Sequence, residues 1–335
     1  MIKAAIVGLG WWGKYIINSL AASDKIRIIL AVDVNADQSR DFAAEKNLAL
    51  TRDLDVALND PEIEMVILAT PHSFHEDQII RAAKAGKQVF CEKPLCLTAA
   101  SAERAIAACQ AAGVKLGIGH ERRFEPALVE IKRMIDAGEL GTIMHVESNF
   151  SHDKLAHVAA DDWRANPHDA PAAGMTGMGI HLTDAYLNMF GPIAELYAQT
   201  ARRVMANPSG DVVSVQLRFA SGATGYLSAI LVTPLFLRFQ VFGSDAWVEA
   251  RNESHPDTPG VTHLTVCRAG GQPQTTTYEW IDSVRANFDS FADSITGAGD
   301  YIFTDDQKFQ NVQVLEAICN SVADNAVVNL QPTGT

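Results

Sequence analysis

Cysteine is scarce in this chain, and long hydrophobic runs are missing. Five cysteines occur in 335 residues; their number is odd and no CxxC pair is present. Neither a disulfide framework nor a zinc site is therefore indicated, and we expect reduced thiols, a cytoplasmic location and no bound metal. No apolar run approaches 18 residues, and glycines interrupt the N-terminal segment early, so we expect no membrane span and no signal peptide.

Positive charge is also in short supply. Lys and Arg total 27 against 40 Asp and Glu, which gives a net charge of −13. A chain of this charge without a basic run is a poor partner for nucleic acid or for an anionic membrane. Hydrophobic residues make up 47% of the chain, enough for full cores, and the length suggests two domains. A small molecule is the expected partner.

The first third of the chain alternates short apolar runs with helical patterns. Expected strands cover residues 3–7, 26–32, 65–70, 88–91 and 115–119; expected helices cover 13–22, 36–46, 76–85 and 98–112. Continuous apolar strands separated by helices are typical of a doubly wound parallel sheet with helices on both faces. The sequence therefore predicts an N-terminal α/β Rossmann domain over residues 1–121.

The pattern changes after residue 121, where strands dominate. Expected strands cover residues 142–150, 193–204, 212–219, 223–231, 237–242, 246–251, 262–267 and 275–280; expected helices cover 126–137, 176–190, 284–296 and 306–325. Hairpin turns between these strands predict a large, mainly antiparallel open sheet. We expect residues 122–335 to form an α+β domain for substrate binding and oligomerisation, whose last helices could pack back on the Rossmann domain.

A glycine motif follows the first expected strand. Gly8, Gly10 and Gly13 fit G-x-G-x-x-G between a strand and a helix, the context in which this motif binds a dinucleotide pyrophosphate. Asp33 ends the second strand, where a carboxylate binds the ribose hydroxyls and repels a 2′-phosphate. No basic residue follows Asp33 immediately, so we expect NAD rather than NADP. Trp11 and Trp12 fill the variable positions of the motif.

Further motifs follow in a fixed order. They are Thr70-Pro71-His72 with His75, Glu92-Lys93-Pro94, Arg123-Phe124 with Pro126, Gly138–Gly141, Asp162-Trp163-Arg164, and Gly179-Ile180-His181 with Asp184. With the glycine motif and Asp33, this series resembles the Gfo/Idh/MocA oxidoreductases over essentially the whole chain. The resemblance implies a dehydrogenase that moves a hydride between NAD and a secondary alcohol or carbonyl of a sugar, polyol or related molecule.

The resemblance also implies roles for individual residues. Lys93 and His181 are the expected catalytic residues: the lysine lies at the reacting carbon, and the histidine relays the hydroxyl proton. The remaining cofactor contacts are expected from Trp11, Trp12, Thr70, Pro71, His72, His75, Glu92, Lys93, Trp163 and Arg164.

Substrate contacts are expected from Asp184, Arg164 and Arg123, with Arg122 and His152 as weaker candidates. For each arginine, a surface salt bridge is the alternative.

One position departs from the family pattern. Many of these dehydrogenases carry an aspartate one turn before the histidine, where this chain has Gly177. Met175 and Met178 flank that glycine, and we expect them to make the pocket wall softer and more apolar.

Two other functions remain open: a redox-neutral glycosidase that uses bound NAD, and a non-catalytic NAD-sensing regulator. The broad sheet is expected to form a homodimer or homotetramer.

Overall fold

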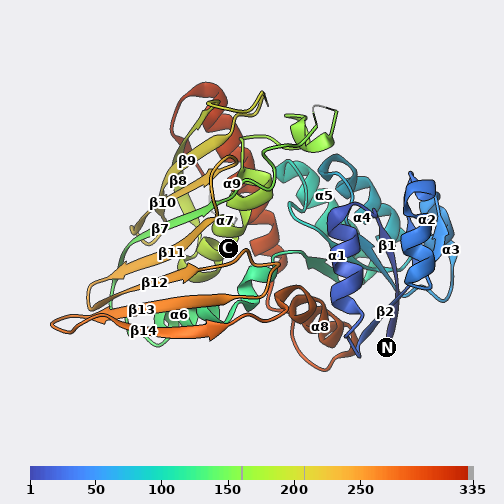
Figure 1. Cartoon of the computed structure of the whole chain (residues 1–335), viewed down its shortest axis with the longest axis horizontal. Helices are drawn as coiled ribbons and strands as arrows, with labels where there is room; N and C mark the ends of the chain where they lie inside the picture. The colour runs from blue at the N-terminus through green and yellow to red at the C-terminus, as the bar shows by residue number, and fades with distance from the viewer. Residues whose placement is uncertain (160, 207, 331–335) are drawn as a thin grey trace. The chain divides into compact units, whose positions relative to one another are not determined.

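The computed structural model describes residues 1–159, 161–206 and 208–330. By contacts within the chain, these residues group into two compact units. Met1–Glu121 and Val284–Phe309 form the first unit, and Arg122–Ser283 with the residues from Gln310 onward form the second. Figure 1 labels the elements of both units.

Six parallel strands form the sheet of the first unit, in the order β3-β2-β1-β4-β5-β6. The strands are β1 (Ile2–Val7), β2 (Ile26–Val32), β3 (Ala49–Thr51), β4 (Met65–Leu68), β5 (Gln88–Cys91) and β6 (Leu116–Ile118). The helices are α1 (Trp11–Leu20), α2 (Ala36–Glu45), α3 (Leu54–Asn59), α4 (His75–Lys84) and α5 (Ala99–Ala112). Strand β4 is buried along its whole length, as expected for a strand covered on both faces. The predicted doubly wound sheet is confirmed.

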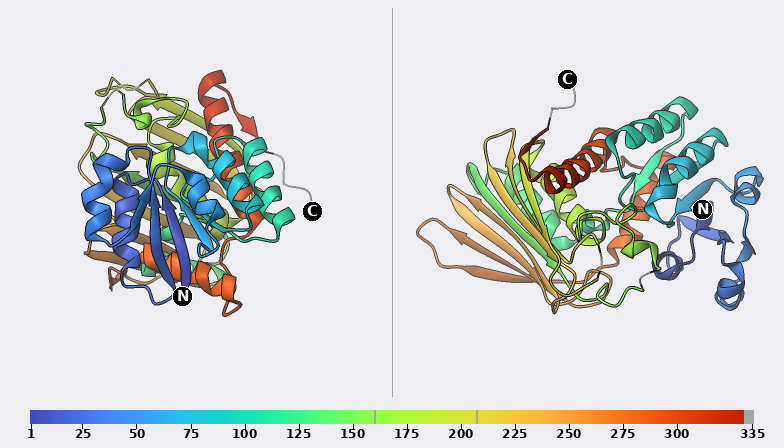
Figure 2. Two further views of the ribbon diagram at one scale, coloured as in Figure 1. Left: turned by 90° about the vertical axis from the view of Figure 1, so that its right-hand side faces the viewer. Right: turned by 90° about the horizontal axis from the view of Figure 1, so that it is seen from above.

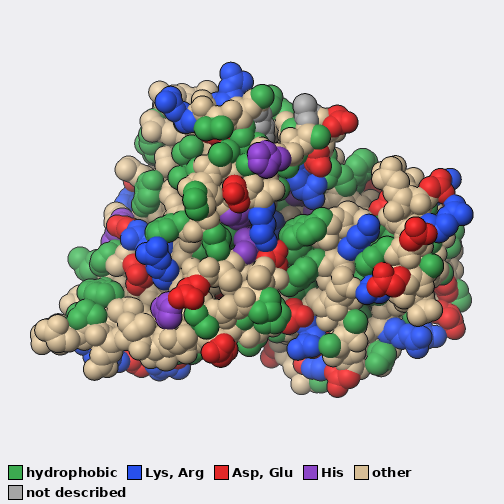
Figure 3. Space-filling view, viewed as in Figure 1, with side chains coloured by type: hydrophobic (Ala, Val, Ile, Leu, Met, Phe, Trp, Pro, Cys, Tyr) green, Lys and Arg blue, Asp and Glu red, His purple; other side chains and the backbone are tan. Residues whose placement is uncertain are grey.

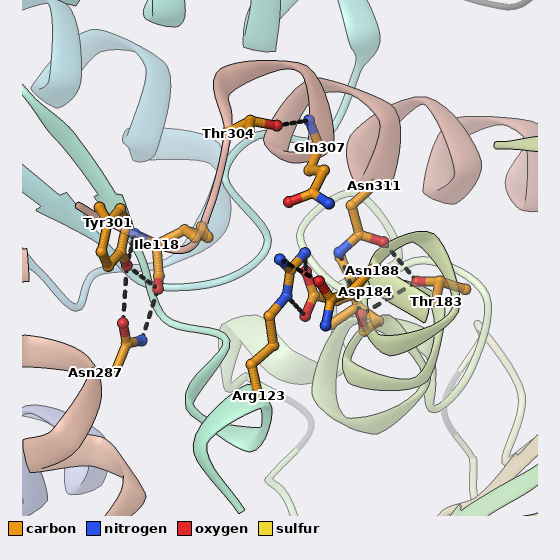
Figure 4. Close-up of polar contacts among 11 residues, drawn as sticks. Ile118, Arg123, Thr183, Asp184, Asn188, Asn287, Tyr301, Thr304, Gln307 and Asn311 are labelled. Atoms are coloured by element: carbon orange, nitrogen blue, oxygen red, sulfur yellow. Dashed lines mark hydrogen bonds and ion pairs between the residues drawn. The ribbon is translucent and has the colours of Figure 1, made fainter. Parts of the chain in front are cut away.

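A segment from late in the sequence completes the first unit. Helix α8 (Ser283–Thr296) contributes Phe288, whose ring stacks on Phe90 of β5 with centroids 3.8 Å apart. Polar contacts hold the same segment to β6: Asn287 donates to the Ile118 carbonyl at 2.9 Å, and the Tyr301 hydroxyl donates to the same oxygen at 3.1 Å (Figure 4). Helix α8 therefore belongs to the core of the Rossmann unit.

Nine strands form the sheet of the second unit, in the order β14-β13-β12-β11-β7-β10-β9-β8-β15. They are β7 (Ile143–Ser151), β8 (Ile193–Ala201), β9 (Val212–Phe219), β10 (Thr224–Ile230), β11 (Phe236–Gly243), β12 (Ala246–Asn252), β13 (Val261–Arg268), β14 (Gln274–Glu279) and β15 (Val328–Asn329). All pairings are antiparallel except that of β7 with β10. The predicted large, mainly antiparallel sheet is confirmed.

Helices cover one face of this sheet (Figure 2). They are α6 (Pro126–Asp136), α7 (Ile180–Phe190) and the part of α9 (Asp305–Asp324) from Gln310 onward. Alternate residues of the strands, such as Val146, Val215 and Val241, pack beneath them in one core. The intervening residues form the opposite face of the sheet, which is only partly buried.

Charges of both signs are interspersed on the face of the molecule shown in Figure 3. Within the described residues, no helix is long and apolar enough to cross a membrane.

Candidate active site

The turn between β1 and α1 requires glycine at two of its three motif positions. Gly8 has φ +96°, and a Cβ there would lie 2.5 Å from the Ala69 carbonyl oxygen. A Cβ on Gly13 would overlap the Gly8 carbonyl oxygen. Gly10 differs, because a Cβ there would meet no atom within 4 Å. The turn is thus closed beneath Gly8 and Gly13 and open above Gly10, where a pyrophosphate can approach the backbone.

The start of α1 suits a phosphate. No side-chain hydrogen bond caps the helix, and its first turn contains no acidic residue. Backbone N–H groups and the helix dipole therefore favour an anion at this end. These features fit the pyrophosphate of NAD.

The two tryptophans of the motif lie in different environments. Trp12 is half-buried and stacks on Tyr15, with ring centroids 4.9 Å apart and planes 2° apart. Trp11 is 58% exposed. Trp12 therefore packs within the unit, while the ring of Trp11 is the one accessible to a ligand.

Asp33 holds the glycine turn in place. One carboxylate oxygen accepts a hydrogen bond from the Leu9 amide at 2.6 Å, and the other accepts from the Asn35 amide at 2.7 Å. Each oxygen has a second lone pair, so the carboxylate can also bind a ribose hydroxyl. Asp33 thus has a structural role in addition to the predicted binding role.

Two arginines that no sequence motif indicated pair with Asp37, four residues after Asp33. The Asp33 amide donates to the Thr51 carbonyl at 3.0 Å, which brings Arg52 next to the end of β2. Asp37 forms ion pairs with both Arg52 and Arg40. The two guanidinium groups lower the pKa of Asp37, the Arg40 hydrogen bond most strongly. Only the pairing of the three-residue strand β3 with β2 reveals Arg52 as a neighbour.

His75 braces two loops together. Its Nδ1 lies 2.8 Å from the Pro94 carbonyl oxygen, and its Nε2 lies 3.1 Å from that of Thr70. His72 is also buried, with its ring centroid 5.7 Å from that of His75. The Thr70 hydroxyl donates to Gln78 at 2.6 Å. The loops after β4 and β5 are therefore fixed to one another.

Glu92 is a buried carboxyl beside the predicted catalytic lysine. Burial raises the pKa of Glu92 to about 7, although the Trp12 indole and the Lys93 charge act in the opposite direction. The Lys93 amide donates to a carboxyl oxygen of Glu92 at 3.3 Å. A Cβ on Gly119 would lie 2.5 Å from the same carboxyl group. The peptide bond between Lys93 and Pro94 is cis.

These segments share one edge of the sheet. The glycine turn, Asp33, the Thr70 loop and the Lys93 loop follow β1, β2, β4 and β5, which are neighbours in the sheet order. Parallel strands end at the same edge, and a doubly wound sheet binds its ligands there. The predicted cofactor and lysine positions of the first unit therefore lie together.

In the second unit, two residues that are predicted to contact the substrate form an ion pair with each other. The Arg123 guanidinium donates to both carboxylate oxygens of Asp184, at 2.8 and 2.7 Å, and also contacts Asn188 (Figure 4). Both side chains are almost fully buried. Removing either partner would leave an uncompensated buried charge. The salt-bridge alternative thus holds for Arg123, although the pair is buried rather than at the surface.

His181 lies in the first turn of α7 and is buried. A π-helical turn, Met175–Gly179, precedes it and contains Gly177. The expectation for the methionines is wrong: Met175 and Met178 are fully buried in the core instead of lining a pocket. A Cβ on Gly177 would lie 3.2 Å from Leu155, so an aspartate there would crowd that leucine.

The remaining predicted contacts lie in short loops. Arg164 stacks over the Trp163 ring at 4.2 Å and forms an ion pair with Asp162. Arg122 is buried and paired with Glu125 at 2.7 Å.

The structure also brings His181 together with residues that no sequence motif marks. The Phe150 ring is bordered by the imidazoles of His152, His181 and His255, with centroid distances of 5.5, 6.3 and 5.5 Å. His255 lies about a hundred residues from His152, so only the pairing of strands makes them neighbours. The one local indication is the run His255-Pro256-Asp257.

Family models match both parts of this chain. The model described as an oxidoreductase family with an NAD-binding Rossmann fold, Gfo/Idh/MocA, matches residues 2–120. The model of the Gfo/Idh/MocA C-terminal domain matches residues 128–249. The chain belongs to the Gfo/Idh/MocA oxidoreductase family. Its first unit is therefore an NAD-binding domain, as the glycine turn and Asp33 predicted.

Relatives in this family match over nearly the full chain. The scyllo-inositol 2-dehydrogenase (NAD(+)) of Bacillus subtilis is 26% identical, over 98% of this chain and 96% of that protein. The crystal structure of aldose-aldose oxidoreductase from Caulobacter crescentus, complexed with glycerol, is 25% identical with a TM-score of 0.87, covering 98% of this chain and 99% of that one. Levoglucosan dehydrogenase, in complex with NADH and L-sorbose, has the same fold at 20% identity and a TM-score of 0.88, covering 99% of both chains.

Proposed function

We propose that this protein oxidises a secondary alcohol of a sugar, a polyol or a related hydroxylated molecule with NAD⁺, or reduces the corresponding carbonyl with NADH. One observation carries the proposal: the glycine turn, Asp33 and the Lys93 loop follow neighbouring strands at one edge of the sheet. The names of the inositol and aldose relatives support the substrate class. We propose the two compact units as the cofactor and substrate domains.

NAD⁺, when bound, would supply the hydride acceptor, and the residues of the chain would bind and transfer the proton. Lys93 shares the proton released from the substrate hydroxyl, and as a cation it polarises the carbonyl in the reverse direction. His181 relays this proton onward. Asp33 and the first turn of α1 hold the cofactor. Arg123 and Asp184 act mainly by fixing the start of α7, since each neutralises the other.

The location and assembly are also proposals. All five cysteines are free and three of them are buried, which suits the reducing cytoplasm. The uncovered face of the nine-stranded sheet is a candidate surface for a homodimer or homotetramer.

The first test is absorbance at 340 nm with NAD⁺ and a panel of sugars, polyols, hydroxy acids and dihydrodiols, with NADP⁺ as control. We expect NADH to form with one substrate class. Lys93→Ala should abolish turnover while NADH binding, followed by fluorescence, persists. If NAD binds but the whole panel is inert, the redox-neutral glycosidase or the regulator replaces the dehydrogenase.

A further inference from the structure

Three imidazoles gather around one phenyl ring in the second unit. Phe150 lies near the end of β7, His152 follows that strand, His181 begins α7, and His255 lies in the loop after β12. The rings of His152 and His255 meet edge to face, with centroids 5.0 Å apart. His181 borders the same phenyl ring, so the expected proton relay and the His152–His255 pair belong to one cluster.

Asp257 fixes the orientation and the tautomer of His255. Its Oδ1 lies 2.6 Å from Nδ1 of His255. A carboxylate can only accept, and the contact from the Asp257 amide to the same nitrogen is longer, 3.3 Å. Nδ1 therefore carries the proton, and Nε2 of the neutral imidazole is an acceptor.

The loop that carries His255 is also held by bonds that do not involve the imidazole. Lys154 donates to both carboxylate oxygens of Asp257 at 2.8 Å, and Thr258 donates to one of them at 2.8 Å. The Trp280 indole holds the Pro256 carbonyl at 2.8 Å. These bonds join the loop after β12 to the loop after β7 and to the end of β14.

The acceptor Nε2 of His255 has no hydrogen-bond partner among the residues that the structure describes. The groups around this imidazole are the rings of His152 and Phe150 and the charges of Asp257, Lys154 and Arg122. Burial lowers the pKa of His255, and this effect outweighs the hydrogen bond that His255 donates to Asp257, which raises the pKa. Burial therefore favours the neutral imidazole, whose Nε2 carries a lone pair.

We propose that His255 determines substrate specificity by accepting a hydrogen bond at Nε2 from a second hydroxyl of the substrate. The hydroxyl that is oxidised binds to His181, which borders the same phenyl ring as His255. The substrate class is then a molecule with at least two hydroxyl groups, and a simple secondary alcohol is a poor substrate. Asp257 and Lys154 are positioning residues that hold the acceptor tautomer. This inference rests on the proposed dehydrogenase function.

A pair of histidine variants on one hairpin tests the proposal. His263 lies on β13, is partly exposed and bonds Glu253 at 2.8 Å, so His263→Ala is the matched control for His255→Ala. With the sugar or polyol that the wild type oxidises, we expect His255→Ala to raise KM roughly three- to tenfold, the loss of one neutral hydrogen bond, and to leave kcat nearly unchanged. His263→Ala should change neither value. An unchanged KM in His255→Ala would overturn the proposal.

Deoxy analogues separate a lost hydrogen bond from a disturbed loop. Replacing the hydroxyl that His255 binds with hydrogen should weaken the wild type but leave His255→Ala unaffected, so that the two enzymes become equal. A general loop defect would instead keep the same ratio between the enzymes for every analogue. That outcome would reject the specificity role.

A binding measurement decides the inference even without turnover. With ¹³C-labelled histidine, the His255 resonance is assigned by its absence in His255→Ala. It is then followed as scyllo-inositol or glycerol is added in the presence of NADH. A saturable shift supports the proposal. No shift with any polyol overturns it, whereas polyol binding without NADH formation from NAD⁺ would reject the dehydrogenase function alone.

Discussion

Glu92 is a carboxyl group whose pKa the fold raises into the neutral range. It is buried between the glycine turn and the Lys93 loop, and its pKa is raised from 4.5 to about 7 because burial penalises the charge. An unfolded chain would ionise this group near pH 4.5. The stability that comes from the neutral form is therefore complete below about pH 4.5 and is lost progressively up to about pH 7.

Glu92→Gln should remove this pH dependence. The amide is neutral at every pH, so the variant should be more stable than the wild type at pH 8, by an amount on the order of 3 kcal/mol, and similar to it at pH 4.5. Urea unfolding of the cofactor-free protein at both pH values measures the difference. Glu103→Gln, at an exposed position on α5, is the control and should show no such change. Equal stability of Glu92→Gln and the wild type at pH 8 would contradict the burial argument.

The cofactor preference depends on a second carboxylate besides Asp33. Asp37 occupies the guanidinium groups of Arg40 and Arg52, which otherwise suit a 2′-phosphate. Asp33→Ser combined with Asp37→Ala should therefore tighten NADPH binding relative to NADH by roughly tenfold or more. Fluorescence titration with the two reduced cofactors gives this ratio. Asp41→Ala, an exposed carboxylate on the same helix, should leave the ratio unchanged.

Single residues of the candidate site could be proposed from the sequence, but the pairing between them could not. Gly8 and Asp33 could be proposed from the sequence because each follows an expected strand, whereas the role of Lys93 rests on the resemblance to the family. Arg123 and Asp184 were also singled out, but their mutual pairing across 61 residues has no local signature. Such a pairing depends on how two segments pack, which composition and spacing do not encode.

Among the elements, helix α8 depends strongly on a single side chain for its packing. Phe288 is buried and stacked on Phe90, and Phe291 meets the same ring edge-on at 5.5 Å. Phe288→Ala should cost about 3–5 kcal/mol, because it leaves a cavity against β5. Urea unfolding measures the loss, and Ser290→Ala on the same helix should change stability little. An unchanged unfolding midpoint would mean that α8 is not part of the first core.

Long elements were predictable and short ones were not. Eight strands of the large sheet and the helices over residues 98–112 and 126–137 follow the apolar periodicity closely. Strands β3 and β15 have only three and two residues, which is too short for an alternation of apolar and polar residues to be recognised. The π-helical turn before α7 was predicted as ordinary α-helix, because its register depends on Met175 and Met178 reaching the core.

At the scale of the whole molecule, assembly would involve the uncovered face of the nine-stranded sheet. Glu147 on β7 pairs with Arg238 on β11 at 2.5 Å, and Trp247 on β12 lies opposite Phe242. A face that combines half-buried aromatic side chains with an ion pair can bind a second copy of itself.

Light scattering should therefore give a mass of two or four times 36.2 kDa. Trp247→Glu should shift the protein toward the monomer, because it places a new charge beside Glu249 and at the centre of the contact. Glu279→Lys, on the outermost of these strands, is the comparison and should have a smaller effect. A wild-type mass near 36.2 kDa would reject this surface as an interface.

The return of the chain to its first unit affects how the protein can fold during synthesis. The ribosome must translate all 162 residues from Arg122 to Ser283 before the segment that covers β5 and β6 begins. At about 5–20 residues per second, that interval lasts roughly 8–30 seconds. During this interval, Phe90 of the nascent Rossmann sheet is not covered by Phe288. The edge strand β6 also lacks its hydrogen bonds from Asn287 and Tyr301. Chaperones that recognise exposed aromatic side chains therefore have a defined window in which to act on this chain.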